Sequence, residues 1–259
     1  MKKFRLNRFF LAIPILLFGM SPVFAANITI SDDVYTGSGW YSNREDQEVE
    51  PGNVKSQVWD LEAFLLNGST LSIVGGFDFK NGEAGGGSKI FRSGDIFIDI
   101  DGDAEYGPSN VGSGSGNSIV NNTFGYDYVL DLDFSSGTYD VYSLNSATSQ
   151  VAVFYSQNDE SNPWRYHAGG TALAGWQDVG FAYLAGLTDG ATGFLGGNHN
   201  MLSVNLGFLL PGTTFTSHFT LECGNDSLMG RATVPEPATL FLLGSGLIGL
   251  AGYRRKTRI

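Results

Sequence analysis

The stretch that decides the fold is residues 95–107, which read Asp-Ile-Phe-Ile-Asp-Ile-Asp-Gly-Asp-Ala-Glu-Tyr-Gly. In its first half, three isoleucines at even positions alternate with Asp95, Phe97 and Asp99. This period of two predicts a half-buried β-strand, because successive side chains of a strand point to opposite faces. Residues 126–134 repeat the alternation, so the two segments predict a matching pair of strands.

Short apolar runs of the same kind, separated by Gly, Asn, Ser and Asp, extend over the rest of the interior. They predict six more strands, at residues 58–66, 70–79, 138–144, 151–156, 202–210 and 214–222. Residues 172–187 would accommodate one short helix. Eight strands with little helix favour an all-β fold, a β-sandwich that is jelly-roll-like or Ig-like, because each sheet must bury one face. Residues 26–233 have the length of a single such domain.

The first 25 residues have the order of a secretory signal peptide. Four cations lie within residues 2–8, an apolar run covers residues 9–19, and small residues end at Ala25. Signal peptidase is expected to cleave after Ala25. The alternative is an uncleaved anchor helix, although the apolar run is shorter than the roughly 20 residues that a membrane span needs.

The last 26 residues, 234–259, have three parts in a fixed order. Pro235, Glu236 and Pro237 come first, an apolar stretch covers residues 238–253, and a basic cluster that begins with Arg254 and Arg255 follows. Proline fixes φ and removes a backbone donor, so the entry to this segment is expected to be extended and accessible to an enzyme. The basic cluster is expected to stay in the cytoplasm and the preceding chain outside. An ordinary buried C-terminal helix is the alternative.

This three-part tail resembles the PEP-CTERM sorting signal. The resemblance implies a single transmembrane helix and cleavage near the Pro-Glu-Pro motif by an exosortase, in bacteria that make exopolysaccharide and biofilm matrix. Residues 218–226, His-Phe-Thr-Leu-Glu-Cys-Gly-Asn-Asp, are similar to the last strand of many ectodomains that carry this tail. Neither resemblance implies an enzymatic activity.

The charge of the chain is unevenly distributed. Residues 26–234 carry 25 acidic and 7 basic side chains, a net charge of −18. Such a surface repels nucleic acid and anionic lipid and attracts divalent cations, and it also keeps an exported protein soluble. Cys223 is the only cysteine, so no intramolecular disulfide forms, and a buried inert thiol is expected at that position.

The acidic turn that follows the deciding strand is a candidate calcium site. Its expected ligands are Asp99, Asp101, Asp103 and Glu105, because calcium takes oxygen atoms from carboxylates and carbonyls. The spacing is not that of an EF-hand, since Ala104 stands where that loop has its glycine. The alternative is an exposed acidic hairpin without a metal, because Asp and Gly favour turns on their own account.

A second candidate site, for a glycan, is Trp164, Arg165 and Tyr166. Aromatic rings cover the apolar face of a sugar, and nearby polar groups bind its hydroxyls. Packing of the same rings in the core is the alternative reading. The three histidines are scattered and are expected to be structural, and one cysteine excludes a two-cysteine zinc site.

The sequence contains no nucleophile elbow, no phosphate-binding P-loop and no dinucleotide-binding motif. It therefore favours a non-enzymatic protein of the cell surface or extracellular matrix, with signal peptidase, exosortase, the membrane and exopolysaccharide as partners and no nucleic acid. A carbohydrate-binding module is the first alternative. A polysaccharide-active hydrolase is the second, because two catalytic carboxylates are recognised only by their separation in space.

Overall fold

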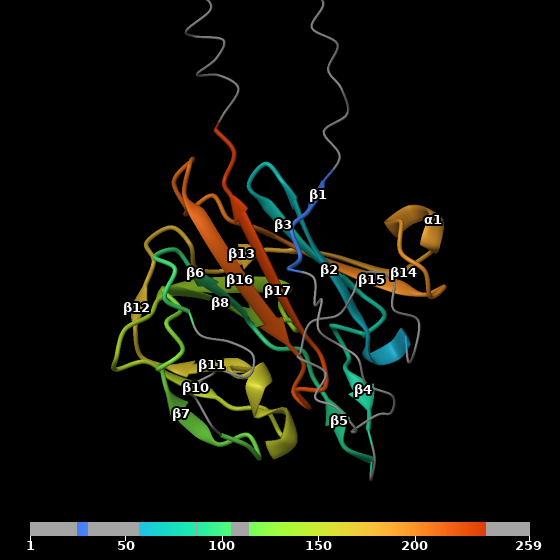
Figure 1. Cartoon of the computed structure of the whole chain (residues 1–259), viewed down its shortest axis with the longest axis horizontal. Coiled ribbons are helices and arrows are strands. Elements are labelled where there is room, and N and C mark those ends of the chain that lie inside the picture. Colours follow the sequence, from blue (N-terminus) through green and yellow to red (C-terminus); the bar gives the residue numbers. More distant parts are fainter. Residues whose placement is uncertain (1–24, 31–56, 86–87, 105–113, 237–259) are drawn as a thin grey trace, which may run out of the picture.

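The computed structural model describes residues 25–30, 57–85, 88–104 and 114–236, and within these ranges the protein consists mainly of antiparallel strands (Figure 1). The smaller of its two main sheets has the order β1-β2-β3-β15-β14. Its strands are β1 (Ala26–Asn27), β2 (Leu61–Asn67), β3 (Thr70–Gly75), β15 (His199–Asn205) and β14 (Ala182–Leu187). The 3-10 helix η1 (Gln57–Trp59) leads into β2, and the single turn α1 (Asp189–Thr192) follows β14.

The larger sheet has the order β12-β9-β8-β6-β16-β17, with β13 also paired to β9. Its strands are β12 (Thr171–Ala172), β9 (Thr138–Ser143), β8 (Tyr128–Asp133), β6 (Ile96–Asp99), β16 (Thr214–Thr220), β17 (Ser227–Thr233) and β13 (Val179–Gly180). The pair expected from residues 95–100 and 126–134 is confirmed, since β6 and β8 are neighbours with Ile96 opposite Leu130.

One hydrophobic core joins the two sheets. Phe64 and Ile73 from the smaller sheet belong to the same buried cluster as Ile98, Leu130 and Phe219 from the larger one. Each sheet hides its apolar face from water against the other, which is the main driving force for this packing. The expected all-β sandwich is confirmed.

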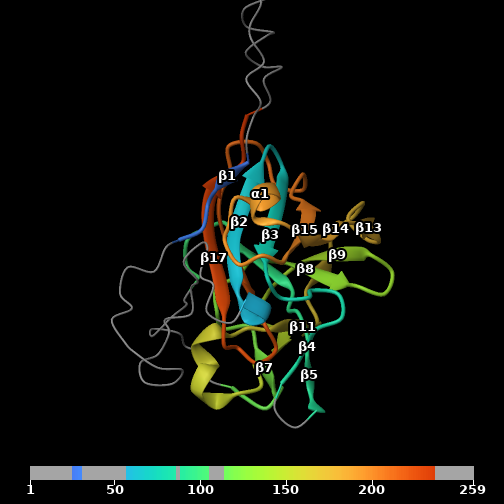
Figure 2. The ribbon, with the colours of Figure 1, turned by 90° about the vertical axis from the view of Figure 1, so that its right-hand side faces the viewer.

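The N-terminal strand closes one edge of the sandwich. Ala26 and Asn27 pair with β2, and two residues later Thr29 bridges to Gly230 of β17 in the other sheet. Figure 2 shows β1 beside both edge strands, β2 and β17. This arrangement gives hydrogen-bond partners to two strand edges that would otherwise remain open.

A third layer covers the outer face of the larger sheet. It is a three-stranded sheet of β11 (Arg165–Ala168), β10 (Ser149–Val151) and β7 (Ile119–Asn121). Phe97 and Val129 are fully buried in a second cluster on this outer face, together with Phe124 and Tyr126. The expectation of a half-buried strand at residues 95–100 was therefore wrong, because β6 is covered on both faces.

Several elements differ from the predicted ones. Residues 172–187 contain β13 and β14 and the end of β12 rather than a short helix, and the strand expected at 202–210 begins at His199 and ends at Asn205. The small hairpin β4 (Glu83–Ala84) and β5 (Ile90–Phe91), the 3-10 segment η4 (Ser156–Ser161) and the strand β17 had no predicted counterpart. No helix in the described ranges is long and apolar enough to cross a membrane, and the predicted span at 238–253 lies outside them.

His218 of β16 is a buried neutral histidine, which agrees with the structural role expected for it. Its Nε2 lies 3.0 Å from the carbonyl oxygen of Pro163, and its ring stacks on Tyr126. Burial lowers the pKa of His218 to about 4. Because the unfolded chain binds a proton near pH 6.5 and the folded chain does not, folding stability falls as the pH drops from 7 to 4.

A His218→Gln variant tests this dependence. Between pH 7 and pH 4 the wild type is expected to lose about 3 kcal/mol of unfolding free energy relative to the variant. Urea unfolding at both pH values measures the difference. An equal loss of unfolding free energy in both proteins would contradict this account, because His218 would then bind its proton equally well in the folded and the unfolded chain.

Candidate functional site

The segment predicted to direct sorting begins where the last strand ends. Val234 is buried, and its amide donates to the carbonyl of Thr213 at 2.9 Å, while the amide of Gly212 donates to its carbonyl at 2.8 Å. Pro235 and Glu236 come next and are exposed. Ala25, at the expected signal cleavage point, is also exposed. Pro237, Arg254 and Arg255 lie outside the described residues.

The acidic turn after β6 brings its three aspartates together. Carboxylate oxygens of Asp99, Asp101 and Asp103 all lie within 4.8 Å of one another. Asp99 is buried, and its Oδ1 accepts hydrogen bonds from the amides of Asp101 and Gly102, at 3.1 and 2.8 Å. Asp101 and Asp103 are exposed. Glu105, the fourth expected ligand, lies outside the described residues.

The charges of this turn oppose one another. Although Asp103 is exposed, some loss of hydration and the negative charges of Asp101 and Asp99 raise its pKa. The pKa of the neighbouring Asp127 is raised by burial and by the same two aspartates. A cation would relieve this repulsion. Two oxygens on opposite sides of a calcium ion are about 4.8 Å apart, so the donor set fits one ion.

A shallow hollow lies beside the turn. Asp99 and Asp101 form one side, and Thr214, Thr216 and Arg231 from β16 and β17 form the other. The register explains the arrangement, because Thr216 pairs with Asp99 in one direction and with Arg231 in the other. Arg231 is only two residues from Thr233, so the acidic turn lies close in space to the end of β17.

The three residues of the expected glycan site have different environments. Trp164 is only 8% exposed, so its ring does not offer a face to a ligand. Tyr166 on β11 is half-buried and stacks on Tyr142 of β9, with ring centroids 4.6 Å apart. Arg165 keeps about a third of its side chain exposed. The surface that the structure provides is therefore Arg165 with the Tyr142–Tyr166 pair, and Tyr142 comes from a strand that the sequence did not connect to it.

Arg165 lies between two carboxylates. Its Nε is 3.6 Å from the buried Asp95, and its Nη2 is 3.7 Å from Asp131. Burial and the charge of Asp95 raise the pKa of Asp131 to about 7, although Arg165 opposes the shift. Asp131 lies directly opposite Asp140 on β9. A carboxyl group that keeps its proton near neutral pH is a feature of acid–base sites, and structural ion pairs produce the same shift.

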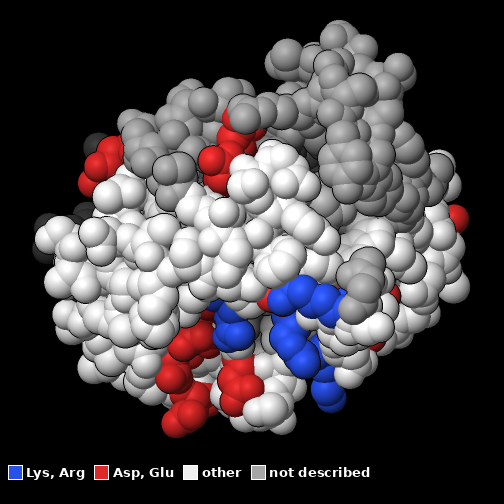
Figure 3. All heavy atoms as spheres, turned by 90° about the horizontal axis from the view of Figure 1, so that it is seen from below, with Lys and Arg blue, Asp and Glu red and all other residues white. Residues whose placement is uncertain are grey.

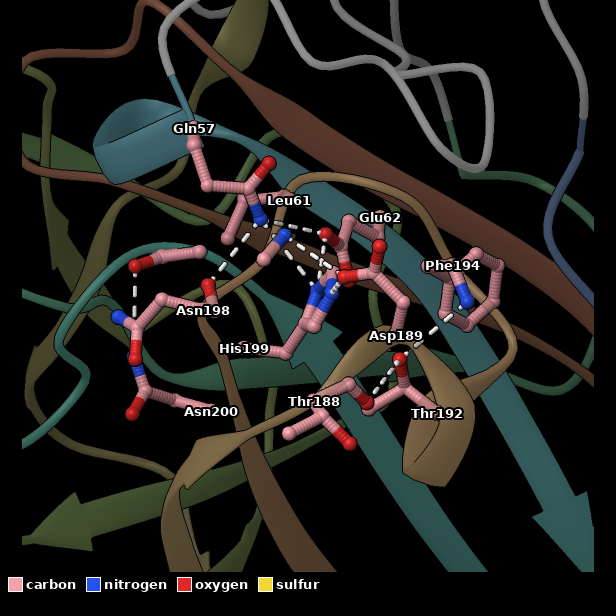
Figure 4. A network of polar contacts seen from close by, with 12 residues as sticks. Gln57, Leu61, Glu62, Thr188, Asp189, Thr192, Phe194, Asn198, His199 and Asn200 are labelled. Atoms are coloured by element: carbon pink, nitrogen blue, oxygen red, sulfur yellow. Dashed lines mark hydrogen bonds and ion pairs between the residues drawn. The ribbon is translucent and has the colours of Figure 1, made fainter.

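A further polar network surrounds His199, at the start of β15 (Figure 4). Its Nδ1 lies 2.5 Å from Oε1 of Glu62 on β2, and its Nε2 lies 3.0 Å from Oδ1 of Asp189 in α1. His199 and Glu62 are fully buried, whereas Asp189 is 44% exposed. Gln57 donates to Glu62 Oε1 at 2.8 Å. The imidazole thus joins the α1 turn to the face of the smaller sheet.

This network was not predictable from the sequence, because a β-bulge positions Glu62. Leu61 pairs with Gly75 and Ala63 with Val74, which leaves Glu62 as the extra residue. A bulge turns its side chain away from the regular alternation. Gly76 allows Gln57 to approach the sheet closely, because a Cβ at position 76 would lie 1.8 Å from the carbonyl oxygen of Gln57. Burial raises the pKa of Glu62, and its Oε2 has no hydrogen-bond partner among the described residues.

Comparison with known proteins bears on the tail alone. The PEP-CTERM protein-sorting motif matches residues 233–256, beginning at the last residue of β17. The chain carries a PEP-CTERM sorting domain. The motif marks this PEP-CTERM protein as an exported protein that an exosortase processes and sorts to the cell surface. No curated protein and no solved structure matched the chain.

Proposed function

We propose that the ectodomain of this PEP-CTERM protein is a non-enzymatic component of the cell surface or extracellular matrix that associates with exopolysaccharide. Signal peptidase removes residues 1–25, and residues 238–253 hold the chain in the inner membrane until the exosortase acts. The observation that carries the proposal is the position of the sorting motif. It starts where β17 ends, so processing releases the whole folded sandwich.

Calcium at the acidic turn is the second part of the proposal. Asp99, Asp101 and Asp103 would hold the ion, with Glu105 as a further ligand, and the ion would neutralise carboxylates that repel one another. The ectodomain has a net charge of −18, so direct contact with an anionic polysaccharide is unfavourable. A partly exposed calcium ion provides a bridge between the two, because it binds carboxylate oxygens from both.

Calcium is therefore expected to stabilise the ectodomain. At a concentration about 100 times its Kd, the ion should raise Tm by roughly 5–10 °C. The double variant Asp101→Asn, Asp103→Asn should lose this rise, whereas Asp178→Asn, which changes an exposed acid elsewhere, should keep it. Differential scanning calorimetry in calcium and in EGTA gives the result. An unchanged Tm in the wild type would refute the calcium site.

Affinity electrophoresis in the native exopolysaccharide tests the function itself. The wild type should migrate more slowly in calcium than in EGTA, and the double variant should migrate at the same rate in both. The second candidate, a carbohydrate-binding module, is favoured by the Tyr142–Tyr166 pair beside Arg165. Retardation that persists in EGTA and is lost in Tyr166→Ala but kept in Tyr166→Phe would select it. Shortening of the polysaccharide that Asp131→Asn abolishes would select a hydrolase.

A further inference from the structure

The end of the sandwich from which the tail leaves is formed by two turns and the end of β17. We call it the sorting end: residues 67–70 between β2 and β3, residues 206–213 before β16, and residues 233–236. Backbone hydrogen bonds join the three segments. The amide of Leu206 donates to the carbonyl of Ser69 at 2.7 Å, and Gly212 and Thr213 bond to Val234. Figure 1 shows both ends of the described chain leaving the molecule here.

The sorting end carries almost no charge. Its three segments contain one ionisable side chain, that of Glu236, and the nearest carboxylates are those of the acidic turn, which begins beside Thr214. The opposite end differs, because lysine, arginine and acidic side chains gather on it (Figure 3). An uncharged surface loses little hydration energy when it approaches lipid headgroups, whereas an acidic surface is repelled by anionic ones.

Leu210 projects from this uncharged surface. It is 75% exposed, the largest value among the big apolar side chains of the described residues. Its neighbour Leu209 is buried, and a turn holds the pair, with the amide of Thr213 donating to the carbonyl of Leu210 at 3.0 Å. An apolar side chain held on a fixed turn is suited to enter a membrane interface.

The length of the chain brings this end to the membrane. Val234 is hydrogen-bonded into the fold, and the apolar stretch proposed as the membrane anchor begins at Ala238. Even fully extended, the link between these two residues is at most about 14 Å long. The headgroup layer occupies roughly half of that length. In the anchored precursor, Val234 therefore lies no more than about 7 Å beyond the headgroup layer.

We propose that the sorting end is a membrane-docking surface, and that Leu210 enters the interface of the bilayer that holds residues 238–253. This inference rests on the membrane anchoring proposed above. One leucine contributes too little to bind a soluble domain to lipid. The short link makes the contact intramolecular, however, so a weak interaction is sufficient. Docking would fix the orientation of the sandwich and hold the Pro-Glu-Pro motif at the membrane surface.

Depth-dependent fluorescence quenching tests the proposal. The chain of residues 26–259 is reconstituted in phosphatidylcholine vesicles as Leu210→Trp and, separately, as Ile119→Trp. Ile119 is the matched control, because it is 59% exposed on β7, at the opposite end of the molecule. With the wild-type emission subtracted, brominated lipid should reduce the emission of Trp at position 210 roughly twofold and leave that at position 119 unchanged.

Flotation of the same samples separates the two proposals. Vesicles that carry the chain to the top of a density gradient, with equal quenching at both positions or none at either, would overturn docking and leave the anchor in place. A chain that stays at the bottom of the gradient would overturn both. Quenching confined to position 210 in floating vesicles is the expected result.

Discussion

His199→Ala is expected to lower the free energy of unfolding by about 3–5 kcal/mol at pH 8, because it removes the partner of a fully buried carboxylate. Glu62 would then keep the hydrogen bond from Gln57, and its Oε2 already lacks a partner among the described residues. Asp189 would lose its hydrogen bond from Nε2, so the α1 turn would also lose its link to the smaller sheet.

The loss should depend on pH in a defined direction. Burial already raises the pKa of Glu62, and removal of the imidazole would raise it further. A carboxyl group with a raised folded-state pKa is stable in its protonated form, so the penalty is small at low pH and grows as the pH rises. His199→Ala should therefore cost less at pH 5 than at pH 8.

Urea unfolding of the ectodomain at the two pH values measures both effects. His167→Ala serves as the control, because His167 is exposed and its loss should change stability by less than about 0.5 kcal/mol. Adding Glu62→Gln to His199→Ala should recover part of the loss at pH 8, since the neutral amide costs less to bury than the carboxylate. A loss as small as that of His167→Ala would contradict the account of this network.

The sequence predicted the fold class because alternation is a local property. Residues 95–100 and 126–134 became neighbouring strands, and the expectation of half-burial was wrong because the third layer covers Phe97 and Val129. Strand β17 was missed for a similar reason. Its first four residues, Ser-Leu-Met-Gly, are all buried, because residues 28–30 and β2 pack beside it, and so they show no alternation of polar and apolar side chains.

The same distinction applies to the sites. Asp99, Asp101 and Asp103 are close in sequence and lie in one turn, so their proximity was predictable. The partner of Tyr166 was not, because Tyr142 reaches it from another sheet. The network of Glu62 and His199 depends on a bulge and on residues 137 positions apart. Local spacing carries no information about either.

Sorting is the prediction with the largest expected effect, because replacing the motif should abolish processing altogether. Pro235, Glu236 and Pro237 lie within the segment that matches the sorting motif, directly after the last hydrogen-bonded residue of the sandwich. Alanine at these three positions leaves the ectodomain and the apolar stretch intact. The variant should therefore be exported and folded, and should keep its tail.

The most direct test is the intact mass of the protein recovered from its native host, separately from membranes and from culture medium. The wild type should have lost both residues 1–25 and the segment after the Pro-Glu-Pro motif. The variant Pro235→Ala, Glu236→Ala, Pro237→Ala should have lost the first segment alone and should remain in the membrane fraction. An intact C-terminus in both proteins would contradict exosortase sorting, because the tail would then act only as a permanent anchor.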